Sequence, residues 1–388
     1  MFSARLHWDL RPNSIARLVA AKRASGARVL DLTESNPTNA GLAMPTDAIL
    51  SAFAHPEMLT YSPDPAGLLA AREAVAGHYM DILHGDIQPD RILLTTSTSE
   101  AYSFLFKLLT DPGDEVLAPQ PSYPLFDFLA GLELVKVVRY PLAYHGAWGI
   151  DFEELAARAG PKTRAIVLVN PNNPTGSFLH RAELAPLMQF CRERKIAIIS
   201  DEVFSDYALR EDDRLVRSLR SCTDVLTFCL SGLSKVVGLP QMKLGWILVS
   251  GPEALRAEAV SRLELIADTY LSVGTPVQLA AAALLTAGGA VRRQIQARTA
   301  RNLAALGAAI GDDSPCRVLN VEGGWYAVIE VPRVRTEEEW ALDLLNRHDV
   351  LVQPGYFYDF EREAFLVVSL LTPEAVFDQG IGRLLTDA

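Results

Sequence analysis

The sequence predicts an α/β fold with a mostly parallel sheet between two layers of helices, a three-layer αβα arrangement. Apolar segments of strand length recur through the middle of the chain, and stretches with helical periodicity separate most of them. Parallel sheets are covered on both faces because their crossover helices pack there. The expected strands span residues 92–95, 116–118, 134–138, 165–169, 196–200, 225–230 and 244–249.

The length of 388 residues exceeds what one ordinary core accommodates, so we expect two domains. A helical pattern over 277–310 is long enough to bridge them. Residues 1–44 are polar and rich in turn residues, which indicates an arm leading into the body of the protein. The expected division is a large domain, residues 43–289, and a smaller α+β domain built from residues 1–42 and 290–388.

The composition narrows the classes of protein to consider. Lys plus Arg number 36 against 47 Asp plus Glu, a net charge of −11, and no block of like charge stands out, which disfavours nucleic-acid and anionic-membrane partners. The N-terminus lacks an apolar core of signal-peptide length, so we expect a cytoplasmic protein. Four cysteines show neither CxxC spacing nor a nearby His cluster, so neither a metal site nor a disulfide framework is expected.

Lys235 lies in the stretch SGLSKVVGLPQMKLGW, shortly after an apolar segment. A lysine forms a Schiff base well when its amine loses a proton readily, which burial and cationic neighbours promote. The small residues around Lys235 leave room beside it, and Lys243 supplies a second cation. An isolated lysine in such a loop is more often a surface residue, so the assignment depends on the rest of the chain.

Polar residues follow several of the predicted strands, where ligands bind in open parallel sheets. Thr98 and Ser99 open a helix directly after a strand, and the N–H groups and dipole of such a helix suit a phosphate. Asp201 ends an apolar strand and needs a cationic partner. A protonated pyridine nitrogen would be one, and a helix cap or an arginine is the alternative.

A lysine for an aldehyde, an aspartate for a pyridinium and a helix start for a phosphate together describe pyridoxal 5′-phosphate. The sequence resembles the fold-type I aminotransferases of class I/II, the group that includes aspartate and alanine aminotransferases. The resemblance implies a pyridoxal-phosphate-dependent enzyme that moves an amino group between an amino acid and a 2-oxo acid through a Schiff base on Lys235. The motifs that carry it are Asn173-Pro-Thr-Gly176, Ser200-Asp-Glu202 and Gly232-Leu-Ser-Lys235.

The resemblance also implies roles for single residues. Lys235 would bind the cofactor and shuttle a proton, Asp201 would keep the ring nitrogen protonated, Asn173 would donate to the ring oxygen, and Tyr123 would stack on the ring. Tyr61 would reach the phosphate of the neighbouring subunit, which implies a homodimer with shared active sites. The other residues implied are Ser97, Thr98, Ser99 and Lys243 at the phosphate and Ser35 and Asn36 at the substrate.

Three positions depart from the family pattern. Lys243 stands where the family has a phosphate-binding arginine, and Phe204 where it has a tyrosine that donates to the ring oxygen. Val367 stands where the family has the arginine that binds the substrate carboxylate. Arg5 is our first candidate to replace that arginine, and Arg362 is the second.

Two alternatives stay open at this stage. The first is a carbon-sulfur lyase on the same scaffold, because a fold does not fix the reaction. The second is a ligand-sensing domain without turnover. Production of a 2-oxo acid at the expense of an amino donor separates a transferase from a lyase, which releases ammonia and pyruvate. The sequence does not identify the donor or the acceptor.

Overall fold

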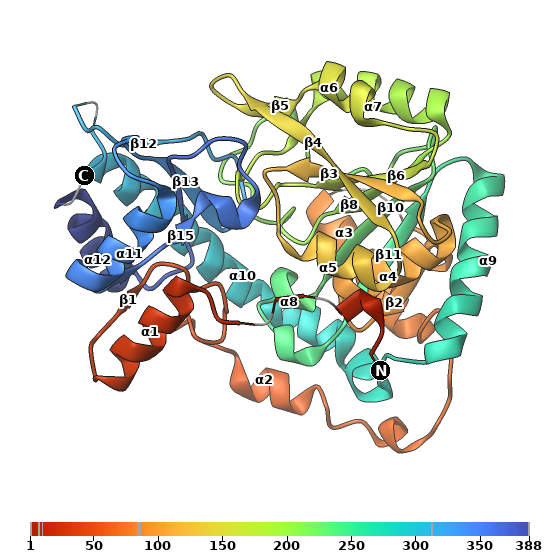
Figure 1. Ribbon diagram of the computed structural model, residues 1–388. Helices are drawn as coiled ribbons and strands as arrows, with labels where there is room; N and C mark the ends of the chain where they lie inside the picture. The colour runs from red at the N-terminus through yellow and green to blue at the C-terminus, as the bar shows by residue number, and fades with distance from the viewer. Residues whose placement is uncertain (1, 7, 10, 84–86, 312, 387–388) are drawn as a thin grey trace.

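The computed structural model describes residues 2–6, 8–9, 11–83, 87–311 and 313–386, and an eight-stranded sheet forms its largest part (Figure 1). The strand order is β2-β11-β10-β8-β6-β3-β4-β5, in which β11 and β5 run antiparallel to their neighbours and the other pairs are parallel. All seven predicted strands belong to this sheet, which confirms the α/β class. The strands are β2 (Ile92–Thr95), β3 (Glu115–Gln120), β4 (Lys136–Tyr144), β5 (Trp148–Ile150), β6 (Thr163–Val169), β8 (Ala197–Asp201), β10 (Thr227–Gly232) and β11 (Gly245–Ser250).

Helices cover both faces of this sheet, as the prediction of three layers requires. Strand residues alternate between the faces, so Ile92 and Leu94 contribute to one apolar cluster and Leu93 to the other. The first face is covered by α3 (Leu69–Leu83), α6 (Phe152–Arg158), α7 (Arg181–Arg194) and part of α10 (Thr275–Ala309). The second face is covered by α4 (Thr98–Leu109), α5 (Leu125–Leu132) and α9 (Glu253–Tyr270).

A second, antiparallel sheet has the order β12-β13-β16-β15 and its own apolar cluster. The predicted long helix is α10, which contacts α3 beside the large sheet and α12 beside the small one (Figure 1). In the described part of the chain, no helix is long and apolar enough to cross a membrane. The elements of this region are β12 (Arg317–Val318), β13 (Tyr326–Glu330), α11 (Glu337–His348), β15 (Gln353–Pro354), β16 (Phe365–Ser369) and α12 (Glu374–Thr386).

Short elements complete the chain. They connect the two sheets or lie at their margins, and one of them, α8, carries Lys235. They are η1 (Ala4–Leu6), α1 (Ser14–Ala24), β1 (Leu30–Asp31), α2 (Thr46–Ser51), η2 (Pro56–Leu59), η3 (Pro89–Arg91), β7 (Leu179–His180), β9 (Leu215–Val216), α8 (Leu233–Val236), η4 (Pro240–Met242), β14 (Val350–Leu351) and η5 (Gly355–Tyr358).

The prediction of a turn-rich arm over residues 1–44 is wrong for α1, a helix of 11 residues. The Asn13 side chain accepts a hydrogen bond from the N–H of Ala16 at 2.8 Å and caps its start. Ile15 is buried with Leu30 and Leu32 in the cluster of the small sheet. The apolar face of α1 is narrow, so packing against α11 and this cap stabilise the helix more than its sequence pattern indicates.

Gly288 allows α10 to pass close to the segment that carries Lys235. A Cβ atom added at Gly288 would lie 2.1 Å from the Cβ of Val237, a distance that no pair of carbon side-chain atoms tolerates. Val237 is the C-cap residue of α8, two positions after Lys235. The surface of α10 therefore fixes how α8 sits against the sheet.

We predict that Gly288→Ala destabilises the protein by about 1–3 kcal/mol, the usual cost of overpacking a core. The adjacent Gly289 is the matched control, because an added Cβ would meet only Arg293 Nη1, at 3.7 Å. Gly289→Ala should stabilise the helix by up to about 1 kcal/mol through lower backbone entropy. Urea denaturation measures both, and equal stability of the two variants would contradict the close contact.

Candidate active site

Three predicted site residues lie at the carboxyl ends of adjacent parallel strands. Asp201 ends β8, Asn173 lies in the loop after β6, and Lys235 lies in α8 directly after β10. The strands β10, β8 and β6 are neighbours and run parallel, so these ends lie at one edge of the large sheet. The geometry thus brings together an amine, a carboxylate and an amide from separate parts of the chain.

Lys235 is partly buried and lies beside two aromatic rings. Its Nζ lies 4.9 Å from the ring centroid of Trp325 and 5.6 Å from that of Phe204. Burial lowers the pKa of Lys235 to about 8, against the opposing effect of the Asp201 charge. The hydroxyl of Tyr207 donates to the backbone carbonyl of Lys235 and anchors α8. The Lys235 amine therefore loses its proton more readily than an exposed lysine does.

Asp201 is a partly buried carboxylate with few partners. It accepts from the N–H of Val203 at 3.2 Å and from the Tyr102 hydroxyl at 3.1 Å. Burial raises the pKa of Asp201 to about 6, although these hydrogen bonds and the Lys235 charge act in the opposite direction. The sequence analysis missed Tyr102. Its position four residues after Thr98, on the same face of a predicted helix, is the signal that could have found it.

The start of α4 has the predicted form. Ser97 is the N-cap residue, and its Oγ accepts from the N–H of Glu100 at 3.2 Å. Thr98 and Ser99 are the first residues of the helix, so their N–H groups point out of its N-terminus. This arrangement offers several donors and a partial positive charge to an anion beside β2.

Lys243 lies near the same helix start. Gly245 at the start of β11 pairs with Thr95 at the end of β2, and Lys243 is two residues before Gly245. Lys243 has φ 53° and is exposed, and within the described ranges it has no acidic partner. The register of β2 and β11 therefore places the Lys243 cation near residues 97–99.

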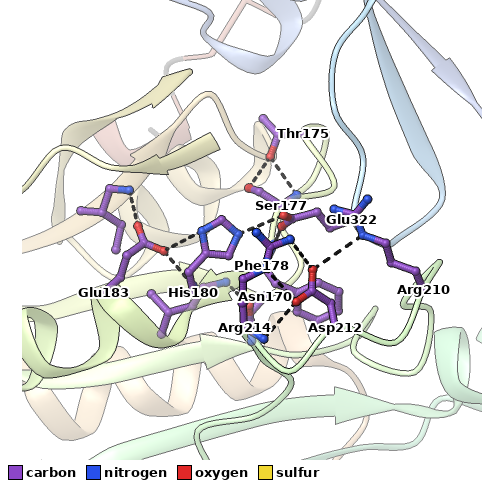
Figure 2. A network of polar contacts seen from close by, with 12 residues as sticks. Asn170, Thr175, Ser177, Phe178, His180, Glu183, Arg210, Asp212, Arg214 and Glu322 are labelled. Atoms are coloured by element: carbon purple, nitrogen blue, oxygen red, sulfur yellow. Dashed lines mark hydrogen bonds and ion pairs between the residues drawn. The ribbon is translucent and has the colours of Figure 1, made fainter. Parts of the chain in front are cut away.

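The loop that carries Asn173 is held by its own polar side chains (Figure 2). Asn172 Nδ2 donates to Thr175 Oγ1 at 2.9 Å, and Thr175 Oγ1 lies 2.8 Å from Ser177 Oγ. Asn173 itself is buried, and its Oδ1 has no hydrogen-bond partner among the residues that the structure describes. A buried amide oxygen without a donor indicates that a bound group completes this site.

Glu322 ties this loop to the small-sheet region (Figure 2). Its buried carboxylate accepts from the N–H of Phe178 at 3.0 Å and lies 2.9 Å from Nε2 of His180. The Glu322 N–H donates to the carbonyl of Gly176 at 3.1 Å. Trp325 follows three residues later, so the same segment holds the Asn173 loop and covers Lys235.

Two predicted aromatic residues lie on loops. Tyr123 follows β3 and is 41% exposed, and partial burial raises the pKa of its hydroxyl. Its neighbour Ser122 donates its N–H to the carbonyl of Tyr358 at 3.0 Å, which joins this loop to the small-sheet region. Tyr61 is 79% exposed in the loop between η2 and α3. Tyr61 thus presents its ring to the outside of the chain.

The predicted substrate residues Ser35 and Asn36 differ in how their side chains are used. The Ser35 side chain shares a hydrogen bond with the Tyr326 hydroxyl, next to Phe204. The Asn36 Oδ1 accepts from the N–H and hydroxyl of Thr38, at 3.1 and 2.8 Å. The Asn36 oxygen is therefore engaged in its own turn, whereas Ser35 faces the aromatic side chains near Lys235.

Val367 is fully buried in an apolar cluster that includes Trp148 and Tyr358. Trp148 comes from β5 of the large sheet, and Val367 comes from β16 of the small one. The space near Val367 is therefore packed rather than open to a polar group.

Neither arginine candidate lies beside Lys235. The Arg5 guanidinium donates to the carbonyl of Leu132, the last residue of α5, at 3.2 Å. Arg362 pairs with Glu330 at 3.2 Å and lies 5.0 Å from the ring centroid of Phe365. This arrangement does not support our expectation that Arg5 or Arg362 replaces the carboxylate-binding arginine.

These residues fit pyridoxal 5′-phosphate. The amine of Lys235 has a lowered pKa, and the α4 N-terminus faces the same edge of the sheet. Among the residues that the structure describes, Asp201 has no strong cationic partner and Asn173 Oδ1 has no donor. The fold and this constellation define a fold-type I aminotransferase scaffold.

Comparison with known proteins identifies the family. The model of the family "aminotransferase class I and II" matches residues 27–384, so the chain belongs to this family, whose members use pyridoxal phosphate. A glutamate-pyruvate aminotransferase of Escherichia coli K12 is 30% identical over 263 residues, which are 67% of this chain and 65% of the relative. The match thus spans less than two thirds of that relative.

Other relatives and solved structures agree with the family and the fold. A Haemophilus influenzae glutamate-pyruvate aminotransferase is 26% identical over 89% of this chain and 87% of its own length. An Arabidopsis thaliana S-alkyl-thiohydroximate lyase is 30% identical over 62% of this chain and 52% of its own. The structure of an alanine aminotransferase from Pyrococcus furiosus superposes with a TM-score of 0.88, at 24% identity, over 100% of this chain and 99% of that one.

We predict that Asp201→Asn stabilises the ligand-free protein at pH 7 but not at pH 4. The pKa of Asp201 in the folded protein is about 6, above the ordinary value of 3.8. The folded parent therefore binds the Asp201 proton more tightly than the unfolded protein does, and it loses stability as pH rises from 4 to 6. At pH 7 the free energy of unfolding of Asp201→Asn should exceed that of the parent by at most about 3 kcal/mol. Thermal unfolding of the ligand-free proteins at both pH values measures it.

Asp212 provides the control for this prediction. Hydrogen bonds from Arg214 hold the pKa of Asp212 below the ordinary value. The ionised carboxylate of Asp212 therefore stabilises the folded state at pH values above the ordinary pKa, and this stabilisation is lost in acid. Asp212→Asn should therefore not stabilise the protein at pH 7. An Asp201→Asn variant that is less stable than the parent at pH 7 would show that burial is not the main influence on Asp201.

Proposed function

We propose that this protein is a pyridoxal-phosphate-dependent aminotransferase that transfers an amino group between an amino acid and a 2-oxo acid. The observation that carries the proposal is the partly buried pair of Lys235 and Asp201 at neighbouring strand ends, with the Lys235 pKa lowered to about 8. When bound, pyridoxal phosphate supplies an electron sink that stabilises negative charge at the α-carbon of the substrate.

Each residue of the pair has a defined task in this proposal. Asp201, ionised beside a protonated ring nitrogen, keeps that nitrogen positively charged, because a buried carboxylate is stabilised by an adjacent cation. The amine of Lys235 would take the proton from the substrate α-carbon and deliver it to carbon C4′ of the cofactor, which suits a lysine whose pKa lies near neutrality. Trp325 and Phe204 exclude water from this amine.

The remaining predicted residues would position the cofactor and substrate. Asn173 would donate from Nδ2 to the ring oxygen, and Tyr123 would stack on the ring. Ser35 would lie at the substrate. The phosphate would be held by Ser97, Thr98, Ser99 and Lys243.

A homodimer is part of the proposal. The exposed ring of Tyr61 would reach the phosphate of the second subunit, which would give shared active sites. The division into residues 43–289 and the two flanking segments, and a cytoplasmic location, remain predictions.

A carbon-sulfur lyase is the second candidate, for two reasons. One relative is named as an S-alkyl-thiohydroximate lyase, and a fold does not fix the reaction. A panel of amino acids, each mixed with the holoenzyme in the absence of an oxo acid, separates the candidates. A transaminase converts each amino acid to its oxo acid once per active site, whereas a lyase releases ammonia and pyruvate with multiple turnovers.

We predict that Lys235 alone binds the cofactor covalently. The purified protein should be yellow, and borohydride should fix the cofactor on the peptide that contains Lys235, as peptide mass spectrometry would detect. Lys235→Ala should lose at least about 10³-fold in transamination, because it removes the amine that moves the proton. A reduced adduct on another lysine would contradict the assignment.

We predict that Lys243→Ala weakens pyridoxal-phosphate binding by about tenfold or more, because a charged hydrogen bond to the phosphate is lost. Lys243→Arg should keep or improve binding. Lys195→Ala is the matched control, because Lys195 has the same left-handed backbone, φ 54° against 53°, and is also exposed. Fluorescence titration of the ligand-free proteins measures the affinity, and equal losses at Lys243 and Lys195 would reject the phosphate role.

A further inference from the structure

Trp325 is a fully buried tryptophan at the centre of the site, and the sequence analysis assigned it no role. Its ring centroid lies 4.9 Å from Lys235 Nζ. It packs edge-on against Phe204, with ring centroids 5.2 Å apart, and against Tyr207, at 5.1 Å. It belongs to the apolar cluster of Ala40, Val291 and Leu371 rather than to the cluster around Val367.

The indole N–H of Trp325 has no acceptor in the part of the chain that the structure describes. Two other fully buried tryptophans differ in this respect, since Trp246 donates to the Tyr79 hydroxyl at 3.0 Å and Trp340 to the carbonyl of Pro332 at 3.2 Å. An indole N–H can only donate, and a buried donor without an acceptor is unfavourable. Trp148 Nε1 also lacks an acceptor among the described residues, but of these two indoles it is Trp325 that lies beside Lys235, where a bound group can supply the acceptor.

The surroundings of Trp325 identify that acceptor. Phe204 occupies the position from which a tyrosine hydroxyl would donate to the ring oxygen of pyridoxal phosphate, and Trp325 touches Phe204. Tyr207, the nearest tyrosine in sequence, uses its hydroxyl on the carbonyl of Lys235 and is not free to substitute. The Nδ2 group of Asn173 is the other donor that we propose for this oxygen. A ring oxygen here would otherwise have one donor fewer than in the family pattern.

We propose that the indole N–H of Trp325 donates a hydrogen bond to the phenolate oxygen of pyridoxal phosphate, in place of the hydroxyl that Phe204 lacks. This inference rests on the proposed function, because it requires the cofactor on Lys235. A donor to the phenolate withdraws negative charge from the ring and so lowers the pKa of the proton shared with the Lys235 nitrogen. Trp325 would thus set the pH at which the bound cofactor changes colour.

The test is a pH titration of the visible absorbance of the resting holoprotein, without substrate. Trp325→Phe should raise the pKa of the bound chromophore by about one unit, the size expected for a hydrogen bond to a charged acceptor. Trp148→Phe is the matched control, because Trp148 Nε1 is also buried without a partner among the described residues but lies in the Val367 cluster. The control should leave the chromophore pKa within about 0.2 units of the parent.

Two further variants separate donation from packing. Phe204→Tyr, added to Trp325→Phe, should return the chromophore pKa toward the parental value, because a hydroxyl again donates to the ring oxygen. Trp325→His keeps a ring N–H and should shift the pKa less than Trp325→Phe does. If Trp325 had a purely structural role, we would expect neither the return of the chromophore pKa in the double variant nor the smaller pKa shift in Trp325→His.

An unchanged chromophore pKa in a folded Trp325→Phe holoprotein would overturn the inference. An unchanged pKa with weaker binding of a dicarboxylate inhibitor would also overturn it, by assigning the donor to the substrate. If Trp325→Phe does not fold, the parent labelled with ¹⁵N-tryptophan provides the test: the Trp325 indole proton should move downfield on cofactor binding, and no shift would refute the bond. Protein that takes up no pyridoxal phosphate would contradict the proposed function itself.

Discussion

The site depends on two opposite charges held in a dry environment at the edge of a parallel sheet. Burial shifts the pKa of Lys235 down and that of Asp201 up, so desolvation favours the neutral form of each group. Their mutual attraction only partly opposes this effect. A ligand that offers a pyridinium to Asp201 and an aldehyde to Lys235 would relieve both groups at once, so in our proposal cofactor binding would remove a cost that the ligand-free fold carries.

Maintaining this pair requires support from both sheets. The large sheet supplies the strand ends, while the segment before β13 supplies Glu322 for the Asn173 loop and Trp325 for the cover over Lys235. On the opposite side, the missing side chain of Gly288 lets α10 pack against the residue that ends α8. The two halves are therefore coupled through the residues that fix the catalytic groups, and not only through the long helix that connects them.

The sequence predicted the layers, all seven strands assigned to the large sheet, and the positions of Lys235, Asp201 and Asn173 at its edge. These features follow from local apolar periodicity and from the rule that ligands bind at the carboxyl ends of parallel strands. It did not predict Tyr102 or Trp325, because their contacts to Asp201 and Lys235 join residues about a hundred positions apart and depend on the final packing. Helix α1 was missed because its cap and its burial against the small sheet outweigh a weak pattern.

The cluster around Val367 has a consequence for substrate range. A guanidinium at this position would recognise one charged group and would reject any molecule lacking it, because a buried charge would be left unpaired. The fully buried valine imposes no such requirement. A site without that charge selects its substrates by shape. For two molecules that differ by one methylene, an apolar surface favours one over the other by only about 10–200-fold. In the aminotransferase that we propose, a valine at this position would thus favour tolerance over strict recognition of one charged group.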